Sequence, residues 1–337
     1  MSLIDLIKDK EMIFVTGKGG VGKSTLSAAL SLYFMQTNPV LAIDIDPAHS
    51  LPDVFGIDAK HNVPEIIFNN PNQLSLLLNT PKQIIDKVYE NSKKELKNRA
   101  EGLPTYQIVM HLYSVVRQLG FPIAMKDFAS LNTTVNEIAL AIKNNQNTKI
   151  IGDLEPSNAT LELLDDAKYC VERLRVMADH KGKISYVARL SKWRDIENFV
   201  KNKDFTNQVK EYADIFASFN NMIRDSEKTS FIIMSEPTPV VLKETTRLRN
   251  ELEELNLNVS AIVFNKDYQN INNKNLKGTI LEHWPVHHRY NTGSYIRQNT
   301  SFKGRYFSIP PLDIGIATTQ KSKIENLKLL LDSVKSI

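Results

Sequence analysis

Cysteine is almost absent from this chain, which contains a single one, Cys170, among 337 residues. One cysteine excludes an internal disulfide, and it also excludes a CxxC zinc site built within one copy of the chain. A lone cysteine on a helical stretch is usually a small buried residue, and we interpret Cys170 in that way.

Long hydrophobic runs and a concentration of one charge are also absent. No run approaches the roughly 20 apolar residues that are needed to span a bilayer, and residues 1–8 show no charged leader before a long apolar core. The formal net charge is only +4, and the lysines are scattered rather than gathered into a stripe, so we expect no nucleic-acid partner. We therefore predict a cytoplasmic protein that associates with membranes at most peripherally.

A glycine-rich segment near the N-terminus carries the clearest chemical signal. Residues 17–24 read GKGGVGKS and lie between the apolar run 12–16 and the helix-like stretch 25–34. Strand, glycine loop and helix in this order are typical of a phosphate-binding loop, because glycines let backbone N–H groups surround an anion and the helix N-terminus adds partial positive charge. The predicted nucleotide contacts in this segment are Gly17, Lys18, Gly19, Gly20, Val21, Gly22, Lys23, Ser24 and Thr25.

The two lysines of this loop have different predicted roles. Lys23 can reach the outer phosphates of a nucleotide, and the Ser24 hydroxyl can bind Mg²⁺. Lys18 is either a solvated surface lysine or a cation that reaches the phosphates of a facing subunit and stabilises transition-state charge there. The GKGGVGKS string resembles the loop of the signature-lysine (deviant Walker A) ATPases, and the resemblance favours the second role and implies a homodimer.

Apolar, β-branched runs recur along the chain and predict a buried parallel sheet. The predicted strands are residues 12–16, 40–45, 149–154, 230–234 and 259–264. Helical segments separate these strands, which is typical of a doubly wound, mostly parallel α/β sheet of the P-loop NTPase type. We predict one P-loop ATPase domain over residues 1–337, with an inserted α-helical subdomain made by two insertions, at about 57–146 and 165–227.

The first of these insertions contains several stretches of helical periodicity. The predicted helices are residues 72–78, 82–100, 106–119 and 131–144. The stretch 106–119 has an apolar face, and two interpretations of that face remain open. It either packs on neighbouring helices or forms the wall of a groove that holds a client helix, where methionines adapt to varied shapes.

Carboxylates follow the second predicted strand. Asp44 and Asp46 emerge beside the phosphate loop, where they can hold Mg²⁺ directly or through its waters. Asp53 lies further along the same segment, on a loop that can fold over the γ-phosphate. Its carboxylate either orients the attacking water or caps a helix that begins at Val54, and the residues alone leave these two interpretations even.

Two segments resemble the switches of the arsenite-pump ATPase and tail-anchored-protein targeting ATPase family. Residues 46–56, DPAHSLPDVFG, resemble switch I, which implies that Asp53 is the hydrolytic residue. Residues 152–164, GDLEPSNATLELL, resemble switch II, which implies that Asp153 lies beside Mg²⁺. With Ser24 and Asp46, Asp153 completes the predicted metal site.

The same resemblance implies further nucleotide contacts. Asn265, at the end of a predicted strand, matches the asparagine with which the family contacts adenine, and residues 308–316 match its adenine loop. The contacts implied in that loop are Pro311, Leu312 and Asp313. Glu244 falls where family members carry a glutamate near the nucleotide and the dimer interface.

The chain also departs from this family in three ways. It lacks the cysteine pair with which the targeting ATPases join their dimer through zinc, and it lacks the metalloid-binding cysteines and the second ATPase half of the arsenite enzyme. Since As(III) and Sb(III) need thiolate ligands, we expect no activation by metalloids. Switch II reads EPSNA where family members commonly read APTGH.

The histidines at 283, 287 and 288 are interpreted as surface or loop residues.

These features predict an Mg²⁺-dependent ATPase that binds ATP and ADP as a homodimer. Its closing and opening would couple to binding and release of a hydrophobic helix of a membrane-protein client, with a membrane receptor as a further partner. Three alternatives stay open: an ATPase subunit that drives an anion- or arsenite-type membrane pump, a membrane-associated spatial regulator, and a module that binds nucleotide but barely hydrolyses it. The regulator requires an amphipathic basic tail, but residues 321–337 are better interpreted as a helix docked on the sheet.

Overall fold

The computed structural model describes residues 1–45, 49–59, 64–78, 125–154, 175, 185, 205–267, 292, 294–296, 298–299, 301–309 and 320–336. The chain divides into two compact units. Unit 1 consists of Met1–Leu78, Asn145–Thr160 and Ile223–Ile337, and unit 2 consists of Asn79–Asn144 and Leu161–Met222.

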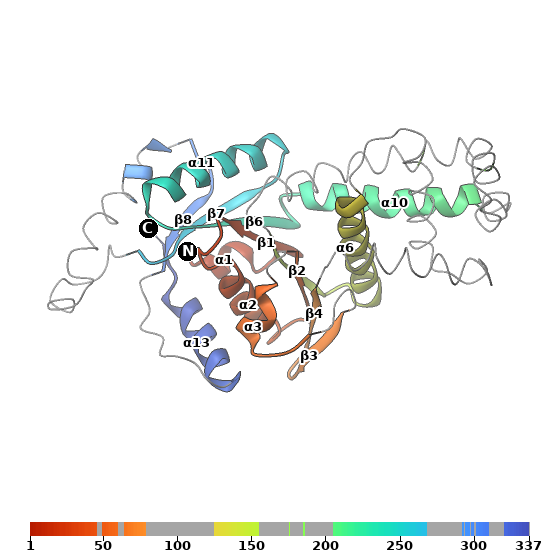
Figure 1. The fold of residues 1–337 in the computed structure, drawn as a ribbon, viewed down its shortest axis with the longest axis horizontal. Coiled ribbons are helices and arrows are strands. Elements are labelled where there is room, and N and C mark those ends of the chain that lie inside the picture. Colours follow the sequence, from red (N-terminus) through yellow and green to blue (C-terminus); the bar gives the residue numbers. More distant parts are fainter. Residues whose placement is uncertain are drawn as a thin grey trace. The chain divides into compact units, whose positions relative to one another are not determined.

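The described residues of unit 1 form a nine-stranded sheet, and Figure 1 shows how its strands are arranged. In chain order, the described strands are β1 (Met12–Gly17), β2 (Val40–Asp44), β3 (Glu65–Asn69), β4 (Gln73–Leu78), β5 (Lys149–Asp153), β6 (Thr229–Ser235), β7 (Val259–Phe264), β8 (Arg305–Ser308) and β9 (Lys335–Ser336). Their order in the sheet is β3-β4-β2-β5-β1-β6-β7-β8-β9. All neighbouring pairs are parallel except β3 with β4 and β8 with β9, which are antiparallel and close the two edges.

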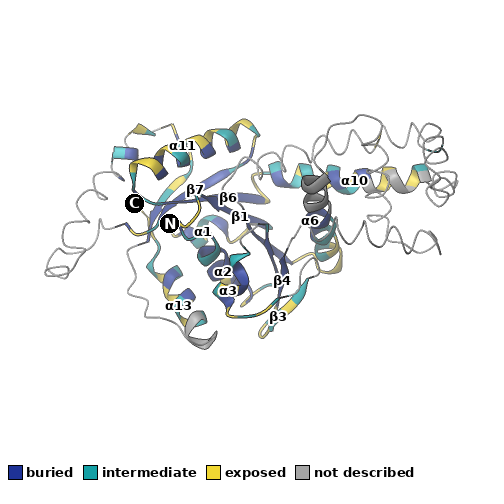
Figure 2. Cartoon of the chain, viewed as in Figure 1, coloured by how far each residue is buried: buried dark blue, intermediate teal, exposed yellow. Residues whose placement is uncertain are grey.

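The central strands are buried along their whole length because both faces of the sheet are covered. Every residue of β1, β2, β5, β6 and β7 is buried. Of these strands, β1, β6 and β7 are labelled in Figure 2 and are dark blue there. The chain moves from β1 to β2 in one direction along the sheet and from β6 to β7 in the other. Right-handed crossovers therefore place the connecting helices on opposite faces. This confirms the predicted α/β fold with its mostly parallel sheet.

The described helices of unit 1 are α1 (Leu3–Ile7), α2 (Lys23–Phe34), α3 (Ser50–Phe55), α11 (Pro239–Glu254) and α13 (Gln320–Ser333). The α2 helix packs on β1, β2 and β5, and α11 packs on β6 and β7. The C-terminal α13 packs against α2 and α3, and it buries Leu327 and Leu330 in the core. The tail is therefore a docked helix, as predicted, but its main contact is α2.

The prediction for residues 72–78 was wrong, because this stretch forms the strand β4 instead of a helix. Periodicity cannot distinguish a short apolar run of this kind from a piece of buried helix. Pairing with β2 on one side and β3 on the other decides the structure, and it buries Leu74, Leu76 and Leu77 completely. The sheet thus continues to residue 78, and the first segment of unit 2 starts at Asn79.

Two long helices are described in the part of the chain predicted as helical insertions. They are α6 (Met125–Asn144) and α10 (Phe205–Arg224). The predicted helix 131–144 is confirmed and begins earlier, at Met125. Residues 82–100 and 106–119 lie outside the described residues, and so do Cys170 and the three histidines at 283, 287 and 288. The inserted subdomain as such stays a prediction.

Candidate functional site

The glycine segment forms a tight turn between β1 and α2, as predicted from its sequence (Figure 1). Gly17, Gly20 and Gly22 have φ values of +141°, +84° and +98°, which L side chains rarely adopt. A Cβ on Gly17 would lie 2.1 Å from the backbone oxygen of Met234 in β6. The close approach of β1 to β6 therefore requires glycine at this position.

The turn leads directly into the N-terminus of α2. Gly22 is the N-cap residue in a left-handed conformation, and no side chain caps the helix there. The first N–H groups of a helix have no partner within it and carry partial positive charge, so this N-terminus can accept an anion. Lys23, the first residue of α2, is buried, while Ser24 and Thr25 are half-buried beside it.

Two fully buried carboxylates lie at the carboxyl ends of the strands next to this turn. Asp44 of β2 is the register partner of Asp153 of β5, so both side chains point to the same face of the sheet. Ser27 of α2 donates a hydrogen bond to Asp153 Oδ1 at 3.4 Å. Asp153 therefore lies beside α2, on the strand adjacent to β1, where a metal ion held with the Ser24 hydroxyl would be expected.

Asp44 connects the sheet to the short helix α3. Its Oδ2 accepts a hydrogen bond from the backbone N–H of Leu51 at 3.1 Å, and His49 Nδ1 lies 3.7 Å from its Oδ1. His49 precedes α3 in a left-handed conformation, with φ +45°. Sequence reasoning missed these contacts, and nothing in the sequence pattern marked His49 as a residue that faces Asp44.

Asp53 lies in the first turn of α3 and is exposed. The helix begins at Ser50, which rules out the alternative interpretation that Asp53 caps a helix starting at Val54. The Leu51 N–H that a capping side chain would satisfy is instead bonded to Asp44. The predicted hydrolytic role of Asp53 is untouched by this correction and stays a prediction.

Asn265 joins the turn after β7 to the glycine segment. Its Nδ2 donates to the backbone oxygen of Val21 at 2.9 Å, and its backbone N–H donates to the oxygen of Ser235 at 2.8 Å. A Cβ on Gly22 would lie 2.8 Å from the same Nδ2. We call Gly17–Thr25, Asp44, Asp153 and Asn265 together the strand-end site.

Comparison with known proteins identifies the family. Residues 10–291 match the family described as anion-transporting ATPase, ArsA_ATPase. The chain belongs to this family.

Several relatives in this family carry ATPase in their names. ATPase GET3C of Arabidopsis thaliana is 25% identical over 264 residues, which cover 77% of this chain and 68% of that protein. The ATPase ASNA1 homolog of Babesia bovis is 27% identical over 282 residues, 82% of this chain and 71% of that protein. The putative arsenical pump-driving ATPase 2 of Aquifex aeolicus is 25% identical over 256 residues, 76% of this chain and 79% of that protein.

Membership in the anion-transporting ATPase family confirms the predicted resemblance and the predicted activity. The chain is an ATPase and binds nucleotide, as the family and its relatives' names indicate. The strand-end site lies within the matched residues 10–291, at the edge of the sheet where ligands bind in open α/β folds.

The structure describes only some of the remaining residues that were predicted to contact the nucleotide. Lys18 is half-buried in the turn after β1. Glu244 lies on α11, where its Oε1 is 2.9 Å from Arg247 Nη2. Outside the described residues lie Asp46, the switch II residues after Leu154, and the predicted adenine contacts Pro311, Leu312 and Asp313.

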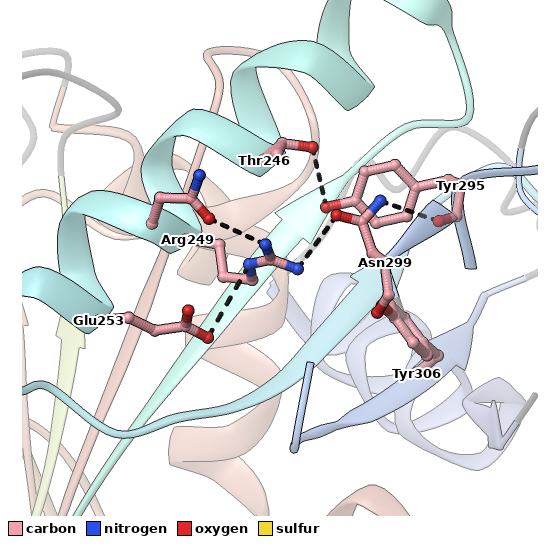
Figure 3. A network of polar contacts seen from close by, with 7 residues as sticks. Thr246, Arg249, Glu253, Tyr295, Asn299 and Tyr306 are labelled. Atoms are coloured by element: carbon pink, nitrogen blue, oxygen red, sulfur yellow. Dashed lines mark hydrogen bonds and ion pairs between the residues drawn. The ribbon is translucent and has the colours of Figure 1, made fainter. Parts of the chain in front are cut away.

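A second polar region of this ATPase lies under α11 (Figure 3). The buried Arg249 donates to Asn299 Oδ1 at 3.1 Å and to Asn250 Oδ1 at 2.8 Å, and its Nε lies 3.8 Å from Glu253 Oε1. The Thr246 hydroxyl donates to the Tyr295 hydroxyl at 3.4 Å. We call these residues the α11 network: Thr246, Arg249, Glu253, Tyr295, Asn299 and Tyr306, which Figure 3 labels, and Asn250.

Burial changes the titration of the two tyrosines in the α11 network. Desolvation raises the pKa of Tyr306 to about 12, and it also raises the pKa of Tyr295. The Tyr306 hydroxyl donates to the backbone oxygen of Asn299 at 3.2 Å. The network thereby fastens the segment before β8 to α11, and we interpret it as structural.

The described part of the chain holds no group of three or more His, Cys, Asp or Glu side chains that could bind a metal ion. Within the described ranges, no helix combines the length and the apolar character that crossing a bilayer requires.

Proposed function

We propose that this ATPase works as an Mg²⁺-dependent homodimer that binds and releases a hydrophobic client helix. ATP would close the dimer and hydrolysis would open it, so that the client is held in one state and released in the other. The observation that carries the proposal is the pair of lysines in one loop. Lys23 is buried at the start of α2, whereas Lys18 is half-buried in the turn after β1, where it can serve a facing subunit.

The residues of the strand-end site suit a magnesium-bound triphosphate. Bound Mg²⁺-ATP would supply the transferable phosphoryl group and a metal charge that offsets charge on its oxygens. The N-terminus of α2 and Lys23 would hold the phosphate oxygens. A Cβ added to Gly19 or Gly20 would meet nothing within 4 Å, so this part of the loop leaves room for a ligand. Ser24, Asp46 and Asp153 are the residues proposed to hold the metal.

The remaining proposed roles concern water and charge. Asp53 would align the attacking water and accept its proton. Asp44 would position Asp53, because the Asp44 carboxylate fixes the first turn of α3, which carries Asp53. Lys18 of the partner subunit would stabilise charge in the transition state. Glu244, Asn265 and the loop residues Pro311, Leu312 and Asp313 are the proposed contacts around the base and the interface.

The client assignment rests on the resemblance to the tail-anchored-protein targeting ATPases. We place the protein in the cytoplasm, with a membrane receptor as a further partner. The apolar stretch 106–119 is the proposed wall of the client groove.

A second candidate function is a subunit that drives a membrane pump. The name of the Aquifex aeolicus relative, an arsenical pump-driving ATPase, favours it. The single cysteine opposes a direct response to As(III), because soft metalloids need thiolate ligands. In this alternative the ATPase would be stimulated by a transporter.

Co-purification distinguishes the two candidates. The Asp53→Asn variant should retain ATP without hydrolysing it. When this variant is purified from the cells in which the protein naturally occurs, in a buffer that contains ATP, we expect it to keep its client bound. Lys23→Ala, which should bind no triphosphate, is the matched control. Recovery of membrane proteins with a hydrophobic tail on Asp53→Asn alone would support targeting. Recovery of one polytopic transporter would instead support pumping, and equal recovery on both variants would contradict nucleotide control of the client.

A further inference from the structure

The side chain of Asn265 is fixed at both ends of its amide group. Its Oδ1 accepts a hydrogen bond from the backbone N–H of Lys266 at 2.9 Å. An oxygen that accepts from an N–H leaves the amide nitrogen on the opposite side, and this nitrogen donates to the Val21 oxygen at 2.9 Å. The neighbouring contacts therefore determine the orientation of the amide.

The backbone around Asn265 is held as firmly as its side chain. The Asn265 N–H is bonded to the oxygen of Ser235 at the end of β6. Lys266 follows in a left-handed conformation with φ +55°, and its Nζ lies 2.6 Å from Glu236 Oε1. The ends of β6 and β7 thus form a rigid support from which one amide group reaches the glycine segment.

The contact with Val21 has a consequence for the next N–H group. The oxygen of Val21 and the N–H of Gly22 belong to the same peptide, and in a planar trans peptide they point in opposite directions. Holding the oxygen toward Asn265 therefore turns the Gly22 N–H away from Asn265. Gly22 is the N-cap of α2, so this N–H belongs to the helix end that would face the phosphates.

We infer that Asn265 is a positioning residue of the phosphate loop, because it holds the Val21–Gly22 peptide in the orientation that presents the Gly22 N–H to a phosphate oxygen. This role rests on the proposed phosphate binding by residues 17–24 and is independent of any client. It is also separate from the adenine contact expected from the family resemblance. The amide nitrogen carries two hydrogens, and the bond to Val21 uses one of them.

The test uses a probe without a base, inorganic tripolyphosphate with Mg²⁺, beside ATP. Asn265→Asp keeps the shape of the side chain but replaces the donor with an oxygen that repels the Val21 oxygen. We expect this variant to bind ATP and tripolyphosphate about 10- to 100-fold more weakly, with the same factor for both ligands. Asn265→Ala should show a smaller loss, again equal for the two ligands, because it removes the donor without adding repulsion.

Asn258 provides the matched control at the opposite end of β7. Its Nδ2 donates to the backbone oxygen of Thr229 at 3.2 Å and to Ser260 Oγ at 3.0 Å. Asn258→Asp should therefore lower the melting temperature without changing the affinity for tripolyphosphate. A loss of binding shared by this control would assign the effect to general destabilisation and contradict the positioning role.

The outcomes separate the inference from its premise. A loss confined to ATP in the Asn265 variants would show a contact with the base alone and would overturn the positioning role. Unchanged binding of both ligands would overturn it as well. A wild-type protein that bound ATP and tripolyphosphate equally poorly would instead contradict phosphate binding by residues 17–24, on which the inference rests.

Discussion

The strand-end site is shaped mainly by backbone groups and glycines, whereas in the α11 network side chains bond mainly to one another. The first region contains three glycines with positive φ and a helix N-terminus that no side chain caps. The second surrounds one buried arginine with two amides, a carboxylate and an aromatic ring, that of Phe302, 5.8 Å from the guanidinium. Polar groups bonded within the protein in this way favour a single packed arrangement.

If the strand-end site is the nucleotide site, as proposed, this difference separates the features that mark function from those that mark stability. Strongly shifted pKa values often indicate active sites, yet here the raised pKa values of Tyr295 and Tyr306 belong to the α11 network. Burial of the two tyrosines is the main cause of these raised pKa values. The better markers are backbone conformations that only glycine adopts easily, together with carboxylates at adjacent strand ends.

Replacing Lys23 should have the largest effect on activity. Lys23→Ala removes the cation that would hold the outer phosphates, so turnover should fall at least about 10³-fold. Steady-state phosphate release measures this loss, and circular dichroism checks that the fold is retained. Lys228→Ala, which replaces a lysine that pairs with Glu11 at 3.5 Å, is the control and should keep full activity. Full activity of Lys23→Ala would contradict the assignment of Lys23 to the outer phosphates.

Two of the loop glycines, Gly17 and Gly19, offer a matched pair for stability. Gly17→Ala would press a Cβ against the Met234 oxygen, whereas a Cβ on Gly19 would meet nothing within 4 Å. We expect Gly17→Ala to lower the free energy of unfolding by about 3 kcal/mol or more, and Gly19→Ala to change it by less than about 1 kcal/mol. Urea unfolding measures both, and equal effects would mean that the close approach of β1 to β6 is not required.

The α11 network should affect stability but not catalysis. Arg249→Met removes the donors that serve Asn250 and Asn299, and we expect a loss of about 1–3 kcal/mol in the free energy of unfolding. The turnover number of the folded variant should match that of the wild type, when both are assayed well below their melting temperatures. A variant with unchanged stability and reduced turnover would show that this network takes part in function.

The smallest expected effect is on stability at alkaline pH. Because the pKa of Tyr306 is raised to about 12 in the folded protein, its contribution is complete below its unfolded pKa near 10 and is lost as the pH rises through about 12. Tyr306→Phe should therefore flatten the decline of the free energy of unfolding in that range. Urea titrations at a series of pH values test this, and an unchanged slope would contradict the shift.

The sequence predicted those parts of the fold whose signals are local. Continuous apolar runs identified β1, β2, β5, β6 and β7, because parallel strands covered on both faces are apolar throughout. The outer strands β3, β4 and β8 were missed, each for its own reason. β3 is only partly buried and β8 is four residues long, and β4 has a run that a helix could also bury.

The candidate site shows the same limit. The positions of the glycine loop between β1 and α2 and of Asp153 at a strand end could be predicted, since both depend on residues close in sequence. The bond between Asn265 and Val21 joins residues 244 positions apart, and the bond between Asp44 and Leu51 depends on where α3 begins. Such contacts follow from the packing of whole elements, which no local pattern records.

Complementation between two inactive variants tests the central claim, that Lys18 serves the site of a facing subunit. Lys18→Ala and Asp53→Asn should each be inactive alone. In a mixed dimer, the Lys18→Ala subunit keeps its own Asp53 and receives Lys18 from its partner, so one site is complete. An equal mixture should recover about a quarter of wild-type phosphate release, since half of the dimers are mixed and each has one of two sites intact. A mixture no more active than either variant alone would contradict the account.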